Sequence, residues 1–181
     1  SQELSYAIDQ SIAEVLLTGL LTDSLGFRTS NTTPRTLRLA ADLQERGANL
    51  PELYFKAMLE KSLEAVKYWG RGLSNIQMQD GLVWTALTLE DREKAEYPGR
   101  DDADIINVLS RIKDAKISLV FVEQTDGTVK ISWRARPNYD VAEIALQFGG
   151  GGHKPAAGAE IKGSIEQVMG DVLAATRKAL D

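Results

Sequence analysis

Four consecutive glycines, residues 149–152, precede His153 in the stretch GGGGHKPAAG. Each glycine weakens regular structure by about 0.5–1 kcal/mol relative to alanine, so stability alone does not favour such a run. A backbone without side chains can approach a ligand closely and point several N–H groups at an anion. His153 can add a hydrogen bond or a positive charge, and Lys154 is adjacent. The stretch therefore indicates an anion site, with a plain hinge as the alternative.

Arg134 supports the same prediction. In an alternating strand it shares a face with Ser132, opposite Ile131 and Trp133. Most strand arginines only meet solvent. This strand, however, ends where the chain turns toward the segment before the glycines, and Arg136 follows. A guanidinium fork close to a glycine cradle suits a phosphate or a carboxylate.

Asp23 is a third candidate, because it directly follows an apolar segment in LLTDSLGF. An unpaired buried carboxylate costs several kcal/mol and tends to become protonated. Asp23 is therefore either exposed at a helix end, acting as a cap, or charged and holding a cation. The residues alone leave both readings open.

Composition excludes several kinds of chemistry. The 181 residues include no cysteine and one histidine, which rules out disulfides, cysteine nucleophiles, zinc ribbons and two-histidine metal sites within this chain. The net charge of −5 argues against a large basic surface for duplex DNA, although a local basic pocket is allowed. The highly charged run 90–104 mixes both signs around a Pro-Gly, so we expect a solvated loop there.

The elements that would position these residues follow from hydrophobic periodicity. Residues 117–122 and 129–134 alternate as strands around an Asp-Gly turn, and a second Asp-Gly at 80–81 predicts a hairpin. Helices are expected over 141–148, before the glycines, and from Ser164 onward, after a short strand at 159–162. The predicted fold class is α/β (mixed α+β), with a mixed β-sheet flanked by helices in the C-terminal part.

The N-terminal part is predicted to be helical. Residues 11–22 are mostly apolar, and Thr33 followed by Pro34 is a favourable helix start, with Gly47 as the stop. Helical spacing then continues from Asn49 to about residue 69, as one long helix or as two, and Gly70 and Gly72 are expected to end it.

Two blocks of this sequence resemble the DHH phosphoesterase family: LLTGLLTDSLGFRTSNTTPRT and ISWRARPNYDVAEIALQFGGGGHKPAAGAEI. The similarity is greatest to its oligoribonuclease/pAp-phosphatase (nanoRNase) branch, which is related to RecJ exonucleases. In that family an N-terminal catalytic domain holds two divalent metals, and a smaller domain with the glycine-histidine motif binds substrate. The resemblance implies a metal-dependent phosphoesterase acting on short oligonucleotides, on pAp, or on both.

The resemblance also implies roles for individual residues. Asp23 matches a metal-binding aspartate, with Mn²⁺ or Mg²⁺ as the metal of the complete enzyme. Arg134 matches the family's substrate-binding arginine, and Asn31, with Thr32, matches its NT pair. The phosphate-binding loop corresponds to Gly150, Gly151, Gly152 and His153, and His153 is also the expected catalytic residue.

The chain departs from the family in one large respect, because it contains neither the Asp-His-His triplet nor the earlier aspartate motifs. We therefore expect residues 1–58 to be a helical remnant of the catalytic domain, 59–73 a helical connector, and 74–181 the substrate-binding domain. Asp23 alone is a poor site for a hard divalent cation, so we expect this fragment to bind no metal and to be inactive by itself.

Other functions remain open at this stage. A non-catalytic module that binds nucleotides or single-stranded nucleic acid is one alternative, and a RecJ-like single-strand exonuclease or a cyclic-dinucleotide phosphodiesterase is another. The expected location is cytoplasmic, without a membrane partner, because no apolar stretch approaches the ~20 residues of a membrane span. Apolar residues around 15–21 predict either a homodimer or disorder of residues ~1–50.

Overall fold

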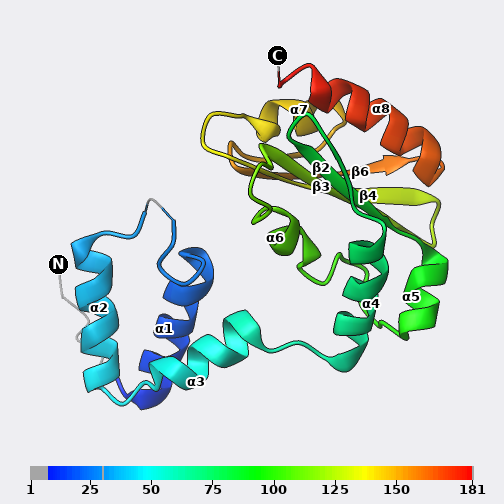
Figure 1. Cartoon of the computed structure of the whole chain (residues 1–181). Coiled ribbons are helices and arrows are strands. Elements are labelled where there is room, and N and C mark those ends of the chain that lie inside the picture. Colours follow the sequence, from blue (N-terminus) through cyan, green and yellow to red (C-terminus); the bar gives the residue numbers. More distant parts are fainter. Residues whose placement is uncertain (1–7, 30, 181) are drawn as a thin grey trace. The chain divides into compact units, whose positions relative to one another are not determined.

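The computed structural model describes residues 8–29 and 31–180, which form two compact units (Figure 1). We call residues 1–61 the helical unit and residues 62–181 the sheet unit. The predicted class is confirmed, since helices of the sheet unit flank one mixed six-stranded sheet. Among the described residues, no helix combines the length and the apolar character needed to cross a membrane.

The helical unit has its own small core. Thr33 caps the second helix in a reciprocal capping box with Thr36, and Pro34 is its first residue, as predicted. The helical stretch after Asn49 is interrupted, since the π-turn ends at Leu59 and a new helix begins after Ser62. The elements are α1 (Gln10–Asp23), α2 (Pro34–Glu45), α3 (Leu50–Tyr54) and η1 (Phe55–Leu59).

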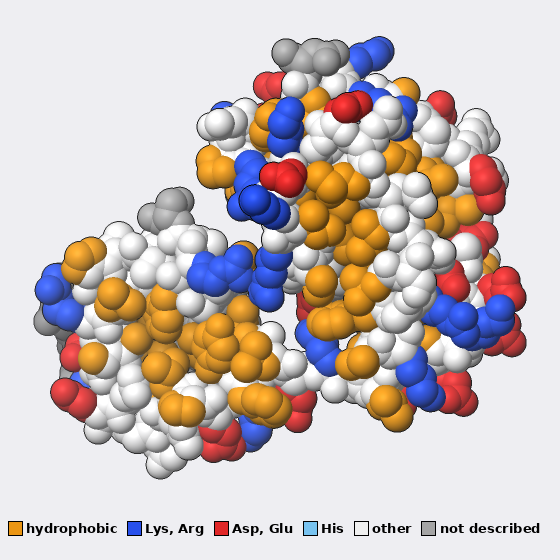
Figure 2. Space-filling view, in the orientation of Figure 1, with side chains coloured by type: hydrophobic (Ala, Val, Ile, Leu, Met, Phe, Trp, Pro, Cys, Tyr) orange, Lys and Arg blue, Asp and Glu red, His pale blue; other side chains and the backbone are white. Residues whose placement is uncertain are grey.

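One face of α1 is apolar and exposed. Leu17 and Leu21 are fully buried, whereas Val15 is 73% exposed and Leu16 46% exposed. Figure 2 shows apolar side chains gathered on the visible face of this unit. The expected exposure is therefore present at Val15 and Leu16 but not at Leu17 and Leu21. Residues 8–29 and 31–50 contain α1 and α2, so the alternative of disorder is not what the structure shows for them. The homodimer stays a prediction.

The sheet unit contains six strands in the order β1-β2-β3-β4-β6-β5. Neighbours pair antiparallel except β2 and β3, which are parallel and are joined through two short helices. The strands are β1 (Gln77–Gln79), β2 (Leu82–Leu87), β3 (Ile117–Glu123), β4 (Thr128–Ala135), β5 (Gly151–His153) and β6 (Ala156–Lys162). The helices are α4 (Leu63–Ser74), α5 (Leu89–Ala95), α6 (Ile105–Leu109), α7 (Val141–Gln147) and α8 (Ile165–Arg177).

Helices cover the two faces of the sheet unequally. On one face α7 and α8 pack over β3, β4 and β6 around the fully buried Trp133 (Figure 1). On the other face α4, α5 and α6 pack over β2 and β3, around Val83 and Val120. The β4, β6 and β5 part of this second face bears polar and small side chains that are exposed or half-buried.

Two local predictions are wrong. The charged run after residue 89 begins with α5, because Thr88 and Asp91 form a capping box that starts a helix. Helix α4 continues through Gly70 and Gly72, and packs on the sheet through Ala65 and Tyr68. At Gly72 a Cβ would lie 2.7 Å from the Ile105 side chain, so close packing requires the glycine.

Candidate functional site

Arg134 lies on the uncovered part of the sheet. Its neighbour Trp133 is buried under α8, and alternation along β4 turns Arg134 to the opposite face, where it is half-buried. The guanidinium donates to the backbone carbonyl of Trp133 at 2.9 Å. This bond orients the side chain and leaves other N–H donors of the fork for a guest.

His153 shares this face with Arg134. In the strand register Arg134 is directly opposite Ala156 of β6, and Ala156 is directly opposite His153 of β5. Residues directly opposite each other point to the same side of a sheet, and neighbouring strands lie about 4.8 Å apart. The α-carbons of Arg134 and His153 are thus roughly 10 Å apart, with one methyl group between them.

The next row across the sheet has almost no side chains. Ser132 is opposite Gly158, and Gly158 is opposite Gly151. A bare floor therefore lies beside the arginine and the histidine, and its residues are exposed or half-buried. We call this surface the platform, and define it by Ser132, Arg134, Gly151, His153, Ala156 and Gly158.

The glycine run is not the free loop that the sequence suggested. The amides of Gly149 and Gly150 donate to the carbonyls of Leu146 and Ala145, at 3.1 and 2.9 Å. With Gly149 at φ +73°, this is a Schellman end to α7. These two amides are therefore not among the several N–H groups expected to face an anion, because α7 uses them to satisfy its last carbonyls.

Close backbone packing explains why residues 150 and 152 are glycine, but it does not explain Gly151. A Cβ at Gly150 would lie 2.2 Å from the carbonyl oxygen of Gly158, and one at Gly152 would lie 2.5 Å from that of Ala156. A Cβ at Gly151 would have nothing within 4 Å, and its φ is not positive. Gly151 alone among residues 149–152 has no structural reason to be glycine.

Asp102 borders the platform beside Ser132. It is 8% exposed, and its Oδ2 has no hydrogen-bond partner among the described residues. Burial raises the pKa of Asp102, against the opposing effects of the Asp104 N–H and the Ser132 hydroxyl. Sequence reasoning missed Asp102 and Gly158. The run of small residues in AAGAE was the available signal for Gly158.

Arg136 and Lys154 are not brought onto the platform by the strand register. The Nε of Arg136 donates to the Ala115 carbonyl at 3.1 Å, so this arginine ties β4 to the start of β3. Lys154 lies in the exposed turn between β5 and β6.

Asp23 and Asn31 belong to the helical unit, where they are in contact. Asp23 is the exposed last residue of α1, and the Asn31 amide donates to its Oδ2 at 2.9 Å. Asn31 also accepts a hydrogen bond from Thr29. Among residues 8–29 and 31–180, no three His, Asp or Glu side chains are placed to hold a metal ion. The described residues therefore offer no complete set of ligands for a divalent cation, and Asp23 as a metal ligand stays a prediction.

A family comparison matches residues 86–181 to the DHHA1 domain. The chain belongs to the DHHA1 domain family. The matched residues include β3 to β6, and so the whole platform. The platform is therefore a surface of the DHHA1 domain itself.

Relatives extend the similarity over nearly the whole chain. It is 37% identical over 171 residues to the bifunctional oligoribonuclease and PAP phosphatase NrnA of Thermus thermophilus, with 93% of this chain and 51% of that protein covered. The protein of the same name from Bacillus subtilis is 26% identical, with 88% and 50% covered. An exopolyphosphatase-related protein from Bacteroides fragilis has a similar structure, with a TM-score of 0.84, 27% identity, and 96% and 50% covered.

The chain thus spans about half the length of these curated relatives. The resemblance to the DHH family is confirmed, and the phosphoesterase context rests on the relatives' names.

Proposed function

We propose that this DHHA1 domain binds the phosphate of short oligonucleotides or of pAp, as the substrate-binding part of a phosphoesterase. The observation that carries the proposal is the platform, where Arg134 and His153 stand in one row beside a bare floor. The oligoribonuclease and PAP phosphatase names of two relatives support the substrate class.

The platform suits a phosphate chemically. Arg134 can donate two parallel hydrogen bonds to phosphate oxygens, and His153 can donate one from the other side. Since β5 is an edge strand, some of its backbone N–H groups point away from β6 and can donate as well. The open space above Gly151 lets a phosphate approach the backbone closely. During reaction, the same donors would stabilise charge that develops on the phosphate oxygens.

We further propose that this chain orients substrate and that hydrolysis needs groups beyond it. Hard divalent cations take about six oxygen ligands, whereas Asp23 offers one carboxylate that already accepts from Asn31. A Mn²⁺ or Mg²⁺ centre would therefore need ligands from outside this sequence. Purified chain with Mn²⁺ and a dinucleotide should yield no mononucleotide, and turnover that follows the protein through purification would refute this.

Binding without chemistry is the second candidate function. The observation that favours it is the ligand set at Asp23, which offers a metal one carboxylate and one amide. The two candidates share the platform and differ in what the rest of the protein supplies. A fusion of this chain to the half of its relatives that it does not cover tests this. Manganese-dependent cleavage by the fusion would favour the phosphoesterase over binding without chemistry.

Calorimetric titration of the chain with pAp and with a dinucleotide tests the platform. Arg134→Ala and His153→Ala should each weaken binding at least tenfold, because a hydrogen bond to a charged group contributes about 1.5–3 kcal/mol. Arg46→Ala, at an exposed arginine of the helical unit, is the matched control and should change affinity less than twofold. Equal affinities in all four proteins would remove the platform as the site.

A further inference from the structure

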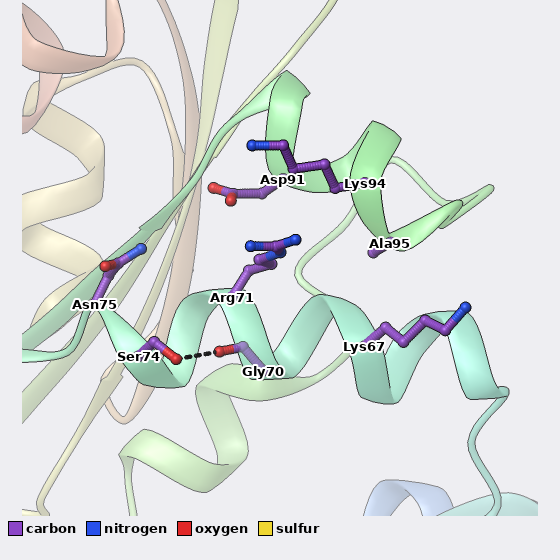
Figure 3. A pocket seen from close by; sticks show the side chains of 8 residues that line it. All are labelled: Lys67, Gly70, Arg71, Ser74, Asn75, Asp91, Lys94 and Ala95. Carbon is purple, nitrogen blue, oxygen red and sulfur yellow. Dashed lines mark hydrogen bonds between the residues drawn. The ribbon is translucent and has the colours of Figure 1, made fainter.

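A groove lies between α4 and α5 of the sheet unit, and none of the platform residues line it. Its volume is about 460 Å³, in the range of small-molecule sites (Figure 3). The helices belong to the side of the sheet unit that packs over β2 and β3, away from β5. The lining residues used below are Lys67, Gly70, Arg71, Asn75, Asp91 and Lys94.

Three cations line this groove together with one carboxylate. Arg71 has neither an ion pair nor a hydrogen bond from its side chain within the described part of the chain. Lys67 lies 3.6 Å from Glu96 and Lys94 lies 2.5 Å from Glu90, in pairs whose side chains are about half exposed or more. Such surface pairs are weak and exchange readily with other anions.

The carboxylate of Asp91 is already occupied. Its Oδ2 accepts from the Thr88 amide at 3.1 Å and from the Thr88 hydroxyl at 2.9 Å, in the capping box of α5. Those two bonds hold Asp91 in place and offset part of its charge, so the groove remains attractive to anions.

Residues of both helices line the groove. Figure 3 shows Arg71 pointing from α4 into the space between the helices, with Asp91 and Lys94 reaching from α5. Asn75 closes one end, and its exposed amide can donate to a guest. An arginine fork in a groove that is also lined by two lysines suits a phosphate group.

Gly70 gives the groove an open floor. A glycine inside a helix weakens it relative to alanine. At Gly72, roughly on the opposite side of α4, packing against Ile105 explains the glycine, but a Cβ at Gly70 would have nothing within 4 Å. No contact within the described chain therefore requires glycine at residue 70, and its lack of a side chain leaves room for a guest.

We propose that the α4–α5 groove binds a multivalent phosphate anion: pyrophosphate, or the phosphate groups of a nucleoside diphosphate. Arg71, Lys67 and Lys94 contact the phosphate oxygens, and Asn75 donates at the end of the groove. The volume exceeds that of a single phosphate, and the lining side chains are charged or polar apart from Gly70 and Ala95, so charge recognises the guest. This site is independent of the platform.

Calorimetry of the full chain at low salt, with pyrophosphate and with ADP as probes, tests the groove. The double variant Arg71→Gln with Lys94→Gln should bind at least tenfold more weakly. A control with the same loss of charge, Arg46→Gln with Lys178→Gln, removes two exposed cations outside the groove and should change affinity less than twofold. Similar affinity for both probes assigns recognition to the phosphates, and tighter binding of ADP adds the nucleoside.

Two further variants keep the test independent of folding and of the platform. Gly70→Ala should keep the circular dichroism of the chain and still weaken binding of both probes. Arg134→Ala should leave groove binding unchanged, whether or not the platform binds nucleotides. No saturable heat with either probe, or equal weakening by the groove and control variants, would overturn the proposal.

Discussion

At Gly151 the requirements of the fold can be told apart from those of the proposed binding site. Its neighbours in the run are glycine because α7 must end and because β5 lies close to β6. Gly151 has neither reason, and it lies in the row of Ser132 and Gly158 on the platform. A methyl group at this position would contact no other part of the described chain and would occupy the space that we propose for the ligand.

Gly151→Ala should therefore fold normally and bind pAp at least tenfold more weakly. The matched variant Gly150→Ala should destabilise the fold by about 1–3 kcal/mol, because its Cβ would overlap the Gly158 carbonyl. Urea unfolding and calorimetry on both proteins separate the effects. Wild-type affinity in folded Gly151→Ala would show that no ligand approaches this residue.

Asp102 predicts a pH effect on stability. Burial raises its pKa above the ordinary 3.8, so the folded state keeps the proton to a higher pH than the unfolded chain does. Ionised Asp102 therefore destabilises the fold increasingly as pH rises from 3.8 through the folded pKa. In the wild type the Asp104 amide donates to Oδ1 of Asp102 at 3.0 Å. Asp102→Asn keeps an acceptor for this amide and removes the buried charge.

The free energy of unfolding of Asp102→Asn should exceed that of the wild type at pH 7, with a smaller difference at pH 4. Urea titrations at the two pH values measure this difference directly. A gain that is equal at both pH values would mean that the ionised carboxylate is not the cause.

At the scale of elements, α7 positions β5. Its C-terminal carbonyls accept hydrogen bonds from the amides of Gly149 and Gly150. The orientation of α7 therefore sets where β5 begins, and with it the positions of Gly151 and His153. Its N-terminus is capped by Asp140, whose carboxylate accepts from Ala142 at 3.0 Å. Loss of this cap should therefore reach the platform through the helix.

Asp140→Ala should cost about 1 kcal/mol of stability and also weaken pAp binding. Ser164→Ala removes the equivalent cap of α8, which packs on the same face of the sheet as α7 but does not lead into β5. This variant should cost a similar amount of stability without changing affinity. Thermal unfolding and calorimetry distinguish the two variants. Identical affinities would show that α7 does not hold β5 in place for binding.

Sequence periodicity predicted most elements, because alternation in β3 and β4 and the Thr33-Pro34 start are local signals. It failed at α5, whose charged residues suggested a loop although Thr88 and Asp91 formed a recognisable cap. The site was only partly predictable. Alternation assigned Arg134 to a polar face, but its row with His153 depends on β6 lying between β4 and β5, which only long-range pairing determines.

At the scale of the whole molecule, the two units have separate cores. The clusters around Trp133 and Val120 lie within residues 62–181, and the cluster around Leu17 lies within the helical unit. The platform needs only the sheet unit. The apolar face at Val15 and Leu16 belongs to the helical unit and remains the expected interface of a homodimer.

Residues 62–181 alone should therefore fold cooperatively and bind pAp with the affinity of the full chain, within about twofold. Domains of this size commonly bury enough apolar surface to fold independently. Circular dichroism and calorimetry on this fragment check the expectation. A folded fragment without affinity would show that the helical unit contributes to the phosphate site.

Amide chemical-shift mapping of the full chain during titration with pAp tests the central claim most directly. We expect the largest saturable shifts at Gly151, His153 and the amides around Arg134, with the same apparent affinity at each. Shifts that saturate elsewhere while these amides stay unmoved would contradict the claim that the platform binds the phosphate.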